Sequence, residues 1–195
     1  MIRSPHRLLV LLAVSVAAIA LAAPALAAPA RAAAPYCGMT WGSLAEQGRS
    51  GTDPAAGQTL TDVRAGRHAC YDRLVLDVAG PVPSSWRVEY VPRITEDASG
   101  RPMSLRGGAA LQIVMGVATY DAAGRPTYTP GNRGELVNLS GFRTFRQVSA
   151  AGSFEGLTTV GLGVRAHLPF RVFTLSGTSG STSGARVVVD VAHRW

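Results

Sequence analysis

Glycine and proline recur along the whole chain and leave few windows long enough for a helix. The 195 residues include 22 glycines and 12 prolines, spread through the sequence rather than gathered into repeats. This distribution excludes collagen-like, coiled-coil and helical-bundle folds, which need a regular repeat or long uninterrupted segments. With 47% apolar and 16% charged residues, the chain can still bury a core. The sequence therefore predicts a globular domain of short strands and turns.

The start of the chain has the three parts of a secretory signal peptide. Arg3 and Arg7 precede an apolar run, Leu8–Ala23, and small residues end at Ala27. A membrane anchor is the alternative, but the strongly apolar core falls short of the roughly 20 residues that a span needs. We expect cleavage after Ala27 or nearby, a linker over residues 28–35 and no later transmembrane segment. The product would be secreted and able to associate with the cell wall.

Two cysteines, Cys37 and Cys70, follow the signal peptide. Cys37 lies too far downstream for lipid attachment. Export would place both thiols in an oxidising compartment with no competing cysteine, so a Cys37–Cys70 disulfide is expected. The alternative is a pair of inert free thiols.

Beyond Cys70, apolar and polar residues alternate with the period of two that is typical of half-buried strands. Such a pattern predicts an all-β fold of about eight short strands, an antiparallel β-sandwich or barrel. The expected strands are Leu74–Val78, Trp86–Tyr90, Leu111–Val117, Leu136–Leu139, Phe142–Val148, Thr158–Ala166, Phe170–Leu175 and Arg186–Ala192.

The strands form a β-domain over residues 71–195, and residues 36–70 form a shorter N-terminal segment that the disulfide ties to it. Within that segment Ser43 and Glu46 have the spacing of a capping box, and Gly48 supplies a stop. We therefore expect one short helical turn there. Ser176–Gly184 contains only serine, threonine and glycine, which predicts a hairpin loop.

Two strand-like segments resemble each other. Arg73–Ala79 and Arg186–Ala192 both begin with arginine and continue through valine-rich positions to Asp-Val-Ala. Arginine and aspartate four residues apart share one face of a strand, so two such strands lying side by side could form cross-strand ion pairs. Structural ion pairs are expected among Arg73, Asp77, Arg165, Arg186 and Asp190.

The same segments resemble a known family. Arg73–Val82, Pro169–Phe173 and Arg186–Val191 look like the first and last strands of AMIN domains, and the chain from Cys37 to Trp195 is similar to AMIN-like domain proteins exported by actinobacteria. Other resembling stretches are Cys37–Ser43, Leu60–His68, Cys70–Arg73, Phe142–Val148, Gly161–Arg165 and Asp190–Trp195. AMIN domains are β-sandwich modules that attach proteins to the cell envelope and peptidoglycan. The resemblance brings no catalytic residues with it and implies binding of an envelope component.

Signatures of catalysis, metal binding and cofactor binding are weak. His68, His167 and His193 have no neighbours at metal-ligand spacing, so no metal site and no catalytic residue are expected. Gly161, Gly163 and Ala166 fit a dinucleotide-binding string, but more strand follows them where that motif needs a helix, and no cofactor is expected. The formal charge of +7 comes entirely from arginines distributed along the chain. Nucleic acid is therefore not an expected partner.

The best candidate binding surface lies where aromatic and arginine residues interleave, at Phe142, Arg143, Phe145 and Arg146. Rings could stack on sugars while guanidinium groups bind carboxylates, as expected for peptidoglycan or an envelope protein. Alternatively, these arginines pair with Asp77 and Asp190 inside the fold. Two other functions stay open, a small-molecule carrier or sensor with its ligand in the barrel mouth, and a secreted hydrolase of unrecognised type.

Overall fold

The computed structural model describes residues 36–53, 57–178 and 181–195, so the expected signal peptide and linker lie outside the described residues. Eleven strands and one 3-10 turn, η1 (Tyr36–Gly38), make up the described regular structure. The strands are β1 (Glu46–Arg49), β2 (Thr59–Arg67), β3 (Tyr71–Ala79), β4 (Ser85–Val91), β5 (Ile94–Thr95), β6 (Pro102–Met103), β7 (Ala109–Met115), β8 (Phe145–Phe154), β9 (Leu157–Val164), β10 (Phe170–Thr178) and β11 (Ser181–Ala192).

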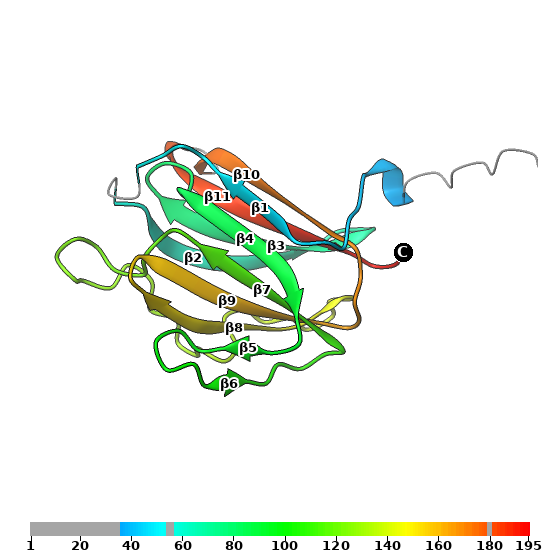
Figure 1. Cartoon of the computed structure of the whole chain (residues 1–195). Coiled ribbons are helices and arrows are strands. Elements are labelled where there is room, and N and C mark those ends of the chain that lie inside the picture. Colours follow the sequence, from blue (N-terminus) through cyan, green and yellow to red (C-terminus); the bar gives the residue numbers. More distant parts are fainter. Residues whose placement is uncertain (1–35, 54–56, 179–180) are drawn as a thin grey trace, which may run out of the picture. The chain divides into compact units, whose positions relative to one another are not determined.

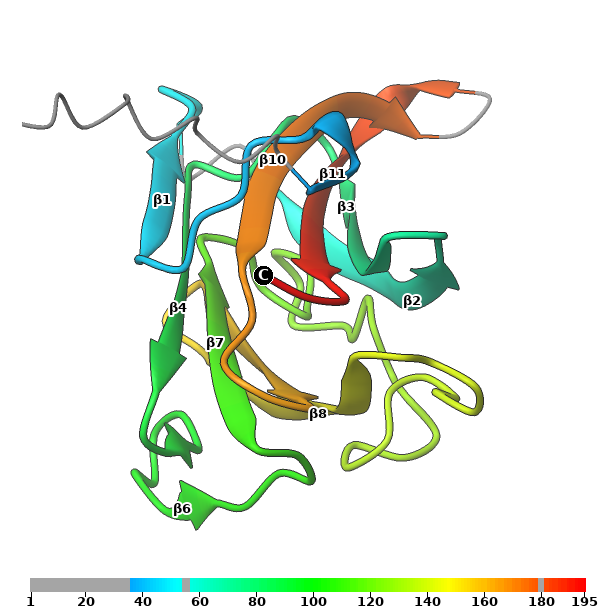
Figure 2. The ribbon, with the colours of Figure 1, turned by 90° about the vertical axis from the view of Figure 1, so that its right-hand side faces the viewer.

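Two antiparallel sheets pack as a sandwich. Sheet A has the order β10-β11-β3-β2, and sheet B has the order β1-β4-β7-β9-β8. Figures 1 and 2 show the two layers, with the small β5–β6 hairpin on the side of sheet B that faces away from sheet A. The predicted all-β antiparallel sandwich is confirmed.

The core lies between the two sheets and follows the alternation of the strands. Leu111, Ile113 and Met115 of β7 are fully buried, and so are Leu74 and Leu76 of β3. Residues between them face outward, because successive side chains of a strand point to opposite faces. Outward positions of β3 and β11 therefore form the outer face of sheet A.

Loop and edge segments close the two open sides of the sandwich. On one side, Gly42 pairs with Phe170, and the Glu46 carboxylate accepts a hydrogen bond of 2.9 Å from the Val172 amide of the edge strand β10. On the other side, the chain between β7 and β8 runs along the β8 edge, where the Leu136 amide donates to the Val148 carbonyl. Backbone groups at these two sheet edges thus form hydrogen bonds although no further strand of the described chain pairs with them.

Several predicted elements differ from the structure. The helical turn predicted at Ser43–Glu46 is wrong. The segment bends at Leu44 and leads into β1 without a helical turn, and the Glu46 carboxylate bonds to β10 instead of capping a helix. Leu136–Leu139 is not a strand but a loop packed on the core. Strand β8 begins at Phe145 rather than at residue 142, and β10 and β11 extend into the predicted Ser176–Gly184 loop.

Gly161 and Gly163, which suggested a dinucleotide motif, lie in the middle of β9. A Cβ atom at Gly161 would stand 2.9 Å from a methyl carbon of Leu105, and one at Gly163 would collide with the Arg106 carbonyl. These glycines let the segment after β6 pack closely against sheet B. Among the described residues no helix is long and apolar enough to cross a membrane.

Candidate functional site

Each of the four strands of sheet A contributes one arginine to the outer face of the sheet. These residues, which we call the arginine face, are Arg64 of β2, Arg73 of β3, Arg186 of β11 and Arg171 of β10. The strand register arranges them in cross-strand rows. One row is Gly66, Arg73, Asp190 and Arg171; the next is Arg64, Val75, Val188 and Phe173; the third is Asp62, Asp77, Arg186 and Leu175.

Asp190 lies at the centre of the first row and is fully buried. Arg73 donates from Nε to Oδ1 at 2.6 Å and from Nη2 to Oδ2 at 2.8 Å, and Arg171 donates from Nε to Oδ2 at 2.9 Å. The hydrogen bond to Asp190 raises the pKa of Arg73. One carboxylate therefore holds two guanidinium groups, and the row keeps a net positive charge.

Aromatic rings flank these two guanidinium groups. The Arg171 guanidinium carbon lies 5.5 Å from the ring centroid of Trp41, 5.6 Å from that of Tyr71 and 5.3 Å from that of Phe173. The Arg73 guanidinium carbon lies 5.2 Å from the Tyr71 centroid. All four distances fall within the range of cation–π attraction, which restricts the motion of both arginines.

Residues from all three rows line a hollow of about 280 Å³, with Val75 and Val188 among them and Arg73 of the first row also present. Arg64 and Arg186 also line it. Arg64 binds Asp77 through Nε at 2.6 Å and Nη2 at 3.0 Å. Arg186, the register partner of Asp77, donates instead to the Gly177 carbonyl at 3.1 Å.

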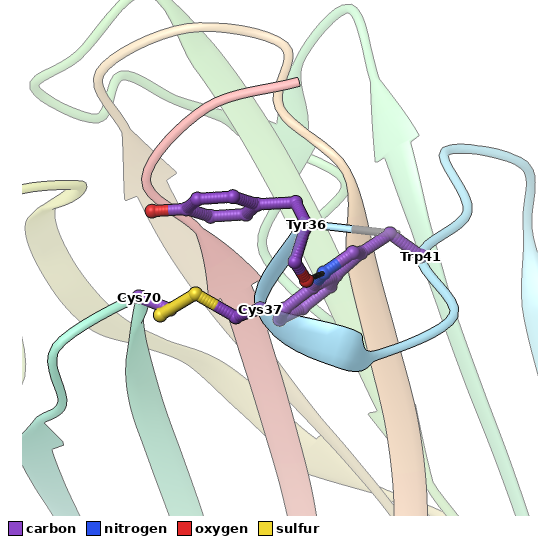
Figure 3. Close-up of a disulfide and its surroundings, with 4 residues drawn as sticks. All are labelled: Tyr36, Cys37, Trp41 and Cys70. Atoms are coloured by element: carbon purple, nitrogen blue, oxygen red, sulfur yellow. Dashed lines mark hydrogen bonds between the residues drawn. A yellow bond between two sulfur atoms is a disulfide. The ribbon is translucent and has the colours of Figure 1, made fainter. Parts of the chain in front are cut away.

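The predicted Cys37–Cys70 disulfide is present and joins the η1 segment to the start of β3. Figure 3 shows Tyr36 and Trp41 beside it, and the Trp41 Nε1 group donates to the Tyr36 carbonyl at 2.8 Å. The disulfide and this hydrogen bond hold the Trp41 ring over Arg171.

The four residues of the predicted aromatic–arginine surface do not lie on one face. Phe145 is 1% exposed and belongs to the core, and the half-buried Phe142 stacks on it at 5.9 Å. Arg146 folds back and donates to the carbonyls of Phe142, Arg143 and Phe145. Of these four residues, only Arg143 is exposed. Phe142, Phe145 and Arg146 line a hollow of about 550 Å³, and Arg143 is not among its lining residues.

Arg165 also lies apart from the arginine face. Its Nη2 group donates to the His193 carbonyl at 2.6 Å, so it bonds to the backbone rather than to an acid. Of the five residues expected in ion pairs, the structure brings Arg73 and Asp190 together and pairs Asp77 with Arg64.

The three histidines of the described residues lie in separate places. His68 stacks on Tyr71 and His167 on Tyr90, while His193 lies 3.1 Å from the Asp72 carboxylate. Asp72 is fully buried, and its other oxygen accepts hydrogen bonds from the Thr144 and Phe145 amides at 2.5 and 3.1 Å. Asp72 and His193 thus connect β3 and the end of β11 to the start of β8 across the sandwich. The described residues hold no group of three metal-ligating side chains.

The sequence patterns missed the residues that complete the arginine face. Arg64, Arg171 and the rings of Trp41, Tyr71 and Phe173 were not among the predicted site residues. The similarity of the β3 and β11 sequences carried a signal, because placing those strands side by side aligns Arg73 with Asp190. The antiparallel pairing of β10 with β11 then places Arg171 opposite Asp190.

Comparison with known proteins identifies the family. The family model of the AMIN-like domain matches residues 58–193, which include all four arginines of the arginine face and Asp190. Neither the curated proteins nor the solved structures contain a match. With most of its length covered by that family model, the chain belongs to the AMIN-like domain family.

Proposed function

We propose that this AMIN-like domain binds an anionic polymer of the cell envelope, peptidoglycan in the first instance, through its arginine face and without catalysing a reaction. The observation that carries the proposal is the contribution of one arginine from every strand of sheet A to the same outer face. The four arginines outnumber the three aspartates in the same rows. A net positive face that extends over four strands suits a polymer with repeating carboxylates better than it suits a small ligand.

The side chains of Arg73 and Arg171 are preorganised for binding such a ligand. Their side chains are 24% and 31% exposed, so Asp190 fixes them without removing them from solvent. Each guanidinium has five N–H donors, and donors not used by Asp190 remain for a carboxylate. Because the side chains are already ordered, binding loses little conformational entropy.

The flanking rings add affinity for sugars. Trp41, Tyr71 and Phe173 are half-buried, so each residue keeps some contact with solvent beside the guanidinium groups. Peptidoglycan presents sugar rings and peptide carboxylates together, so it matches both kinds of side chain. A secreted protein with a disulfide would meet this polymer outside the cytoplasm.

Co-sedimentation with isolated cell walls tests the proposal. Arg64→Gln combined with Arg186→Gln removes two cations while leaving the Asp190 cluster intact. We expect the double variant to bind walls at least about tenfold more weakly, since a hydrogen bond to a charged group is worth about 1.5 to 3 kcal/mol. Binding should also weaken as salt is added.

Arg87→Gln is the matched control. Arg87 is 47% exposed and paired with Glu89, just as Arg64 is 47% exposed and paired with Asp77, but it lies on sheet B. If Arg64→Gln and Arg87→Gln weakened binding to cell walls equally, the result would contradict a binding site confined to the arginine face. A loss confined to Arg143→Gln would move the site to the surface beside the start of β8, and no retention of the parent chain would refute wall binding.

A further inference from the structure

A cleft of about 1040 Å³ runs along β8, on a part of the molecule that the proposed function does not use. Its walls come from the segment between β5 and β6, the loop between β7 and β8, and β8 with its neighbour β9. Charged and polar side chains line the cleft together with apolar ones.

Asp97 lines this cleft with one carboxylate oxygen unpaired. Its backbone amide donates to the Ala151 carbonyl at 3.0 Å, and its Oδ1 accepts from the Thr159 hydroxyl at 2.9 Å. Its Oδ2 is buried and has no hydrogen-bond donor. An unpaired buried carboxylate oxygen is unfavourable, and buried polar groups in native proteins seldom remain in this state.

Arg133 lines the same cleft with an uncommitted guanidinium group. Its backbone is fixed, since its carbonyl accepts from the Ala150 amide at 2.8 Å and from the Ser149 hydroxyl at 3.1 Å. Within the described residues its side chain forms no ion pair. The nearby acid Glu96 pairs with Arg101 at 2.7 Å instead.

The cleft therefore holds a negative and a positive group that do not pair with each other. Apolar surface lies beside them, with Tyr120 38% exposed, Tyr128 half-buried and Leu136 half-buried. Within the described residues the Thr159 hydroxyl is the one side-chain donor to the Asp97 carboxylate, so a ligand that binds Oδ2 requires the carboxylate to turn from its buried position. A ligand with an ammonium group, a carboxylate and a short apolar body would satisfy all three features.

We propose that the β8 cleft binds a zwitterionic ligand of the amino-acid or short-peptide class. The ligand ammonium group donates to Asp97, its carboxylate accepts from Arg133, and its side chains contact Tyr120 and Tyr128. This site does not depend on wall binding by the arginine face. Charge-assisted hydrogen bonds at both ends of the ligand would set its orientation.

Calorimetric titration of the purified chain with dialanine tests this proposal. We expect saturable binding, and at least about tenfold weaker binding of N-acetyl-dialanine and of dialanine amide, because each modification removes one charged contact. No saturation at millimolar dialanine would overturn the proposal. Equal affinity for the parent and the doubly modified dipeptide would overturn it too.

Three variants localise the binding. Arg133→Gln and Asp97→Asn should each weaken dialanine binding about tenfold. Arg93→Gln, an exposed arginine outside the cleft, should leave it unchanged. In Asp97→Asn, the amide oxygen can still accept the hydrogen bond from the Thr159 hydroxyl. An unchanged melting temperature would confirm that the fold of each variant is intact. Unchanged affinity in both cleft variants would refute the site, whereas loss in Arg64→Gln with Arg186→Gln would assign the dipeptide to the arginine face.

Discussion

The arginine face and the β8 cleft each contain an aspartate among arginines, but the two aspartates are bonded very differently. Both oxygens of Asp190 accept from guanidinium groups, and the side chain is fully buried. Asp97 accepts one side-chain hydrogen bond and keeps a buried oxygen without a donor. A satisfied carboxylate stabilises the fold and positions its partners, whereas an unsatisfied one leaves bonding capacity for a ligand.

Strand register explains the difference. Arg171, Asp190 and Arg73 lie directly opposite one another on three adjacent strands, so regular pairing brings their side chains together. Asp97 and Arg133 lie in irregular segments whose positions are set by backbone hydrogen bonds to β8. Those bonds fix the two main chains without requiring the two side chains to meet.

The largest expected effect comes from removing the covalent tie beside the arginine face. Cys37→Ser with Cys70→Ser opens a disulfide that spans 33 residues of sequence. We expect the free energy of unfolding, measured with urea, to fall by about 3 to 4 kcal/mol on the loop-entropy model. Reducing the parent chain should produce the same loss. An unchanged midpoint would show that the η1 segment contributes nothing to stability.

A somewhat smaller loss should follow Asp190→Ala. Arg73 and Arg171 would remain side by side without the carboxylate that holds them. We expect a loss of about 3 kcal/mol, the lower end for breaking a buried ion pair, because both arginines keep some contact with solvent.

Asp77→Ala is the control on the same face of the sheet. Its partner Arg64 is 47% exposed, so the loss should stay within about 1 kcal/mol. Similar losses in the two variants, measured by urea unfolding, would contradict the distinction between the buried and exposed pairs.

The sequence predicted those parts of the molecule that regular strand geometry determines. Alternation identified β7 and β9, and the resemblance between β3 and β11 indicated that their arginines and aspartates would pair across strands. Strands β1 and β2 were both missed, and β2 pairs with β3 in sheet A. The four residues of β1 alternate little, and its position depends on contacts of Gly42 and Glu46 with a distant strand. Local pattern carries no information about such contacts.

The candidate sites were harder to predict than the fold. Phe142–Arg146 alternates rings and cations along the chain, yet Phe145 is drawn into the core and Arg146 bonds to its own backbone. The β8 cleft joins segments that are distant in sequence, such as those containing Asp97 and Arg133. Neither outcome follows from residue spacing, because both depend on how loops pack against a completed sheet.

The smallest expected effect concerns Glu96, the acid of the cleft that does have a partner. Its pKa lies below the usual value, chiefly through the hydrogen bond from Arg101 and then that from Ser99, with a smaller contribution from the charge of Arg133. A carboxyl group whose pKa is lowered by folding stabilises the protein above its unfolded pKa, and this contribution is lost as pH falls through the folded pKa. Because the Glu96 side chain keeps 31% of its surface in solvent, an NMR titration of that side chain is a better measurement than a melting curve.

We expect Arg101→Gln to move the pKa of Glu96 upward, toward its ordinary value, and Arg133→Gln to move it less in the same direction. That order means that Arg101 is the partner of Glu96 and that the Arg133 guanidinium remains uncommitted in the cleft. The reverse order would make Arg133 the partner of Glu96. The cleft would then resemble the arginine face, with its charges already paired, and it would have no free cation for a ligand carboxylate.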